Sequence, residues 1–129
     1  LEFFRTRPDK MFVVVTAPPL VQAATDSKQA ANARKLNDWL ANEWLPEAAW
    51  SGKNVFVFDL FNVLTDPDHH HRIADGIVEH VHGRGKNFSA YGSTETDSHP
   101  TPQGNRKATK EFVPLLNAWY DTWKNGGRP

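Results

Sequence analysis

The 129-residue sequence contains no cysteine, and this absence excludes several kinds of chemistry. Thiol nucleophiles, disulfide bonds and thiolate metal sites all require a cysteine sulfur. Acidic and basic residues balance at 15 each, so bulk charge gives no reason to expect nucleic acid or an anionic membrane as a partner. No apolar run reaches the roughly 18 residues of a membrane span, and no signal peptide is visible. We therefore expect no membrane partner, and the compartment stays open.

Motifs that identify common enzyme classes are also missing. The sequence has no Gly-Asp-Ser, no Gly-x-Ser-x-Gly and no His-Glu-x-x-His element, and no glycine-rich phosphate loop follows an apolar run. From these patterns we assign the chain neither a cofactor nor a metal.

Aromatic residues, in contrast, are plentiful. Five tryptophans and eight phenylalanines indicate a substantial buried surface, or an exposed one that awaits a partner. The length fits a single domain, residues 1–129. The chain opens on an apolar Leu1-Glu2-Phe3-Phe4 without an initiator methionine, which is typical of the middle of a longer, truncated protein.

Two continuous apolar, β-branched runs predict strands buried on both faces, as in a parallel sheet. They span residues 11–16 and 55–59. Between them, Asp26 or Thr25 caps a predicted helix that runs to about Trp44, and Pro46 ends it. Its predicted apolar stripe comprises Ala33, Leu36, Leu40 and Trp44, with Trp39 on the flank. The fold class is therefore α/β, with a short parallel sheet flanked by helices.

The rest of the chain predicts two more helices and a loop. Ile73, Ile77 and Val81 recur every four residues, which favours a short helix interrupted at Gly76. Residues 83–100 are rich in small polar residues and predict a loop. A last helix runs from about Pro102 to Lys124, capped by Thr101, kinked at Pro114 and stopped by Gly126-Gly127. Its predicted buried face comprises Ala108, Phe112, Leu115, Leu116, Trp119 and Trp123.

Two strands leave a sheet with two bare edges, and three or more are normally needed for stability. Exposed edges recruit other strands. We therefore expect a homo-oligomer that pairs through a sheet edge or the tryptophan-bearing helices, or completion by an upstream segment.

The stretches Lys10–Leu20, Val55–Asp59 and Asp97-Ser98-His99-Pro100, followed by Gly104-Asn105, together resemble the C-terminal half of an SGNH (GDSL-type) hydrolase. This resemblance implies half of a three-layer α/β/α fold. It also implies hydrolysis of a small-molecule ester or an acylated sugar through a Ser-His-Asp triad. The family's blocks for the nucleophilic serine and the oxyanion hole lie upstream of the matched region.

Within this resemblance, His99 matches the family's catalytic histidine and would act as general base. The family's acid position falls on Thr96, and Asp97, one residue later, is the candidate orienter of His99. Ser93, in a Gly-Ser-Thr loop close to His99, is the candidate nucleophile within the chain. Water or an upstream serine are the alternatives.

Two other functions stay open at this point. One is a metal-dependent hydrolase built on the cluster Asp66-Pro67-Asp68-His69-His70-His71, whose carboxylates and imidazoles suit Zn²⁺, with His80 and His82 downstream. The other is a non-catalytic, truncated or repurposed fragment that binds a partner, a metal or nucleic acid. A solvated polar loop is the simplest interpretation of the histidine cluster.

Overall fold

The computed structural model describes residues 1–125 as a mixed α/β chain. Its helices and strands are, in order, α1 (Glu2–Arg5), β1 (Phe12–Val15), the 3₁₀ turn η1 (Gln22–Ala24), α2 (Ser27–Asn42), α3 (Trp44–Glu47), β2 (Val55–Phe58), α4 (Leu60–Thr65), β3 (His70–Ala74), β4 (Ile77–Val81) and α5 (Pro102–Lys124).

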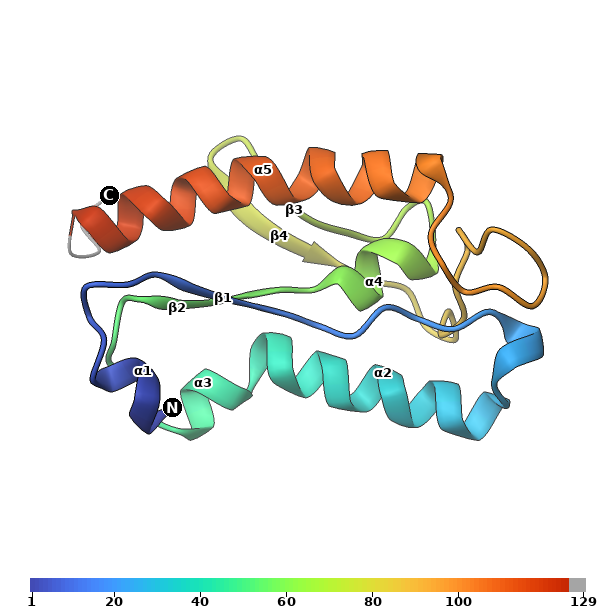
Figure 1. The fold of residues 1–129 in the computed structure, drawn as a ribbon, viewed down its shortest axis with the longest axis horizontal. Helices are drawn as coiled ribbons and strands as arrows, with labels where there is room; N and C mark the ends of the chain where they lie inside the picture. Colours follow the sequence, from blue (N-terminus) through green and yellow to red (C-terminus); the bar gives the residue numbers. More distant parts are fainter. Residues whose placement is uncertain (126–129) are drawn as a thin grey trace.

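The strands β1 and β2 lie between two long helices (Figure 1). Helix α2 lies on one side and α5 on the other, with the hairpin β3–β4 on the α5 side. β1 and β2 pair in parallel, with Phe12 opposite Val55 and Val15 opposite Phe58. The prediction of a parallel strand–helix–strand unit flanked by helices is confirmed.

Helix α2 begins as predicted but buries an unexpected face. Asp26 caps it and forms a capping box with Gln29, so Asp26 and not Thr25 is the cap. The predicted apolar stripe is only partly right: Ala33, Leu40 and Trp44 are half-buried, but Leu36 is 57% exposed. The buried positions are Ala30, Arg34 and Asn37. The side of α2 that faces the interior packs against polar groups.

The end of α2 also differs from the prediction. The helix ends at Asn42, and Pro46 lies within the following short helix α3 instead of terminating α2. Proline is tolerated in a first turn because the amide groups there lack an intrahelical acceptor.

The helix predicted over residues 73–81 is wrong. These residues form the antiparallel hairpin β3–β4, in which Ile73 lies opposite Val78 and Ala74 opposite Ile77. The two residues between the strands, Asp75 and Gly76, have φ of 51° and 79°. Asp-Gly with positive φ at both positions is the preferred two-residue hairpin turn.

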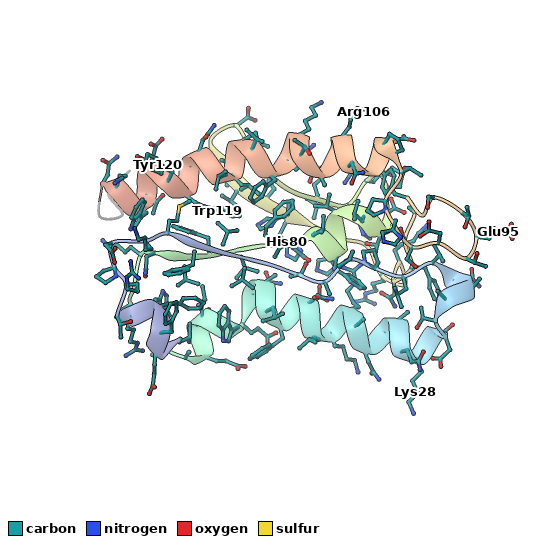
Figure 2. The ribbon with its side chains drawn as sticks, viewed as in Figure 1. Lys28, His80, Glu95, Arg106, Trp119 and Tyr120 are labelled. Atoms are coloured by element: carbon teal, nitrogen blue, oxygen red, sulfur yellow. The ribbon has the colours of Figure 1, made fainter. Side chains whose placement is uncertain are left out.

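Helix α5 spans the predicted residues, and the Thr101 hydroxyl accepts a hydrogen bond from the Gly104 amide as its cap. Its inner face supplies Leu115 and Trp119 to the core, together with Phe58 of β2 and Val63 of α4. Figure 2 shows Trp119 pointing from α5 toward the strands, and its ring stacks on Phe56 at 5.4 Å.

Pro114 lies inside α5, and the predicted Gly126-Gly127 stop lies outside the described residues.

In the part of the chain that the structure describes, the parallel sheet has two strands. Pairing of its edge with a second copy, or with another segment, stays a prediction. None of the helices described here combines the length and the apolar composition that crossing a bilayer demands.

Candidate functional site

The carboxyl ends of β1 and β2 carry buried polar residues. Thr16 directly follows β1 and Asp59 directly follows β2, and the Thr16 hydroxyl donates to Asp59 Oδ1 at 3.0 Å. In open α/β sheets, ligands bind beyond the carboxyl ends of the strands. The loop of residues 83–100 lies at the same end of the molecule (Figure 1).

The predicted pair Asp97 and His99 is in contact within this loop. Asp97 Oδ1 lies 2.6 Å from His99 Nδ1 and also accepts the His99 backbone amide at 3.0 Å. The Ser93 hydroxyl, the His99 amide and the His99 ring together lower the pKa of Asp97 to about 2, so the carboxylate is ionised at neutral pH. An ionised acceptor at Nδ1 directs the ring proton to that nitrogen and turns Nε2, with its lone pair, outward.

The backbone around this pair is fixed by contacts at both ends of the loop. Gly92 and Pro100 form an antiparallel bridge, and the Thr101 amide donates to the Tyr91 carbonyl at 2.8 Å. A Cβ on Gly92 would lie 2.2 Å from Val21 Cγ1, so only glycine permits this close approach. The loop that carries His99 is therefore positioned by the segment after β1.

Ser93 lies next to the pair but on the side of the acid. Its hydroxyl donates to Asp97 Oδ2 at 2.6 Å, whereas no hydroxyl among residues 1–125 forms a hydrogen bond with His99 Nε2. Ser98 is engaged elsewhere, because its hydroxyl accepts the Val21 amide at 3.0 Å. The three predicted residues are together, in the order serine–acid–histidine.

The histidine cluster that suggested a metal site is used for internal contacts. His69 Nε2 accepts the Gly83 amide at 2.7 Å, and its Nδ1 lies 3.0 Å from the Thr65 hydroxyl. His71 Nδ1 accepts the Asp59 amide at 2.9 Å. Because Asp66, Asp68 and His69–His71 do not bring three ligand atoms together, the cluster does not form a metal centre in the described residues.

Burial lowers the pKa of His71 to about 4, and the neighbouring His80 contributes to this shift. The unfolded chain takes up the proton near pH 6.5, before the folded chain does, so folding is favoured above pH 6.5 and loses stability as the pH falls. We expect the free energy of unfolding, measured in urea with EDTA present, to fall by roughly 3 kcal/mol between pH 7.5 and 4 through this residue alone.

The variant His71→Asn tests this expectation, because the amide oxygen of asparagine replaces Nδ1 as an acceptor without titrating. It should flatten the dependence on pH, whereas the exposed control His82→Asn should leave it unchanged. If the free energy of unfolding of His71→Asn depends on pH as steeply as that of the wild type, His71 is not the source of the pH dependence.

A buried arginine was missed by the sequence interpretation. Arg34 of α2 donates to Asn62 Oδ1 at 3.0 Å and to Thr65 Oγ1 at 2.7 Å, and its guanidinium lies 4.7 Å from the centre of the Phe61 ring. It also donates to the Lys86 carbonyl at 2.5 Å. Arg34 thereby ties α2 and α4 to the loop that carries Asp97 and His99.

A large groove lies elsewhere, between β3 and α5. It has a volume of about 710 Å³ and a basic lining that includes Arg72, Arg106, Lys107 and Lys110. Neither Asp97 nor His99 lines it, and the His99 side chain is 91% exposed. The histidine therefore faces open solvent.

No protein-family model, curated protein or solved structure matches this chain. The resemblance to SGNH hydrolases therefore stays a prediction, and function has to be argued from the site itself.

Proposed function

We propose that this chain carries the acid–base pair of an ester hydrolase, with His99 as general base and Asp97 as its orienter. The observation that supports the proposal most strongly is the 2.6 Å contact between Asp97 Oδ1 and His99 Nδ1. A carboxylate that holds the imidazole by one nitrogen leaves the other available for proton transfer.

The chemistry requires a hydroxyl at His99 Nε2. The imidazole takes the proton of this hydroxyl while the hydroxyl oxygen attacks the ester carbonyl. It then returns the proton to the departing alcohol. When the attacking oxygen is that of water, the second product is the free acid; when it is that of a serine or another side-chain hydroxyl, the product is an acyl-enzyme, and water deprotonated by the same imidazole then releases the acid and restores the hydroxyl. The attacking oxygen belongs to water, to a serine of this chain such as Ser93, or to a hydroxyl from another segment or copy.

The hydrogen bonds that Asp97 accepts are consistent with its proposed role as the orienter of His99. Its two oxygens accept three donors, from Ser93, from the His99 backbone and from the His99 ring. Such a carboxylate cannot rotate freely, so the imidazole is held in one orientation. Preorganisation of this kind contributes to catalysis because the groups need no rearrangement during the reaction.

The resemblance to the SGNH family supports the same chemical class. The substrate we propose is a small-molecule ester or an acylated sugar, and the fold we propose is the later half of the family's three-layer architecture, completed by another copy or segment. The 91% exposure of His99 is compatible with this proposal, because a site assembled with a further segment would cover it.

The roles of Asp97 and Ser93 are separated by two substitutions. Asp97→Asn should lower kcat/KM for a p-nitrophenyl ester about 10-fold or more, because an amide stabilises neither the Nδ1-protonated ring nor the imidazolium that forms. Ser93→Ala should cost only about 3-fold if Ser93 merely supports Asp97, since general-base catalysis itself is left in place. Initial rates at several ester concentrations give both values.

Complete loss of turnover in Ser93→Ala, with Asp97→Asn affected less, would make Ser93 the nucleophile. Unchanged rates in Asp97→Asn would contradict the proposed role of the pair.

A further inference from the structure

A second cluster of titratable side chains lies in the interior, away from the loop of His99. It joins Asp38 of α2, Asp59 after β2 and His80 of β4, and each contributes one ligand atom within 4.8 Å of the others. Figure 2 shows His80 near the middle of the molecule, between the layers of α2 and α5. These three elements are distant in sequence and meet only in the folded chain.

The three ligand atoms are also orphaned. Asp38 Oδ1, Asp59 Oδ2 and His80 Nε2 are buried and have no hydrogen-bond partner among the described residues. Asp59 is completely buried, and its Oδ2 lies 2.5 Å from His80 Nε2 without the alignment of a hydrogen bond. Buried polar atoms nearly always have a hydrogen-bond partner, and three such atoms that converge without one would be satisfied by a bound cation.

The surrounding contacts fix the direction of two of the ligands, Asp59 and His80. Asp59 Oδ1 accepts the Thr16 hydroxyl and the Asn62 amide, which leaves Oδ2 as the oxygen that faces His80. The Asn42 side-chain NH₂ donates to the Asp38 carbonyl at 2.9 Å, so the Asn42 oxygen faces His80 Nδ1 at 3.2 Å.

This orientation of Asn42 requires a proton on His80 Nδ1, so Nε2 is the nitrogen that can offer a lone pair to a metal. An oxygen that accepts a hydrogen bond from one imidazole nitrogen is the usual support for a metal bound at the other.

A proton alone does not satisfy the cluster. Protonation of His80 Nε2 would compensate Asp59 Oδ2 but would leave Asp38 Oδ1 without a donor. The nearest cation to that oxygen is Arg34 Nη1, at 3.6 Å, which is beyond hydrogen-bond distance. A divalent cation can contact all three atoms at once.

We propose that Asp38, Asp59 and His80 bind a divalent transition-metal ion, with Zn²⁺ the best fit to one imidazole nitrogen and two carboxylate oxygens. A tetrahedral zinc ion holds such ligands at about 2.0–2.2 Å, which places them about 3.4 Å from one another. Asp59 Oδ2 and His80 Nε2 lie 2.5 Å apart and all three ligand atoms lie within 4.8 Å of one another, so small side-chain shifts would bring the separations to this value. The ion would tie α2, β2 and the hairpin together, independently of the reaction at His99.

Zinc titration of the EDTA-dialysed chain, with a chromophoric chelator as competitor, tests this site. We expect one ion per chain and a higher melting temperature with Zn²⁺ than without it. Asp38→Asn and His80→Gln should each raise the Kd at least ~10-fold, the range seen when even a supporting group of a metal site is lost. Co²⁺ should give visible absorption in the wild type that both variants lose.

His82→Gln and His99→Ala are the matched controls, because both remove a histidine outside the cluster, and both should bind zinc as the wild type does. Far-UV circular dichroism checks the fold of each variant. Because Asp38 is partly exposed on α2, Asp38→Asn still tests the site if His80→Gln fails to fold. Absence of saturable binding at one ion per chain would overturn the proposal. Equal affinity in Asp38→Asn and the wild type, or loss of binding in His99→Ala, would also overturn it.

Discussion

His99→Ala should lower kcat/KM for a short-chain aryl ester by about 100-fold or more, the lower end of what general acid–base catalysis contributes. We expect this loss of activity because the substitution removes the imidazole of His99, which the ionised Asp97 holds in place. The melting temperature should stay the same, since the side chain is 91% exposed and buries almost nothing.

A matched control is needed because exposed histidines react slowly with activated esters. His82 is also exposed, and its described contacts include no carboxylate. His82→Ala should therefore retain the wild-type rate. Equal rates in His99→Ala and His82→Ala would show that the hydrolysis is a general property of exposed imidazoles and that the pair has no catalytic role.

Arg34→Met should destabilise the fold by about 3–5 kcal/mol, because each buried acceptor that loses its donor costs about 1–3 kcal/mol. The guanidinium donates to Asn62, Thr65 and the Lys86 carbonyl, and methionine leaves all three acceptors without this donor, with Asn62 and Thr65 buried. Urea denaturation followed by circular dichroism gives the free energy of unfolding.

Lys35→Met is the control, because Lys35 is exposed on the next position of the same helix and its loss should change stability by no more than about 0.5 kcal/mol. Arg34→Lys should fall between the two, since an ammonium retains the charge but cannot span the same acceptors. A loss below about 1 kcal/mol in Arg34→Met would show that the network contributes little to stability.

The parts of the fold that sequence predicted well are those with local signals. Continuous β-branched runs gave β1 and β2, and Asp26 and Thr101 gave the caps of α2 and α5. The hairpin β3–β4 was missed because Ile73, Ile77 and Val81 also fit a helical period. The Asp75-Gly76 pair, a strong turn signal, would have identified it.

The site was predictable only where its residues are neighbours in sequence. Asp97 and His99 are two positions apart and meet in the loop. Arg34, Asp59 and His80 come from three elements, and an apolar period cannot reveal that polar residues of α2 and β4 face inward. The apolar stripe failed at Leu36 for this reason, since α2 packs its polar side against the end of β2 and α4.

The central claim is that the Asp97–His99 pair supports ester hydrolysis, and a multiple-turnover assay with p-nitrophenyl acetate tests it most directly. We expect saturable hydrolysis in which each chain releases many equivalents of product, and loss of this activity in His99→Ala. Release of at most one equivalent per chain, or a rate that rises linearly with ester and is unchanged in His99→Ala, would contradict the claim.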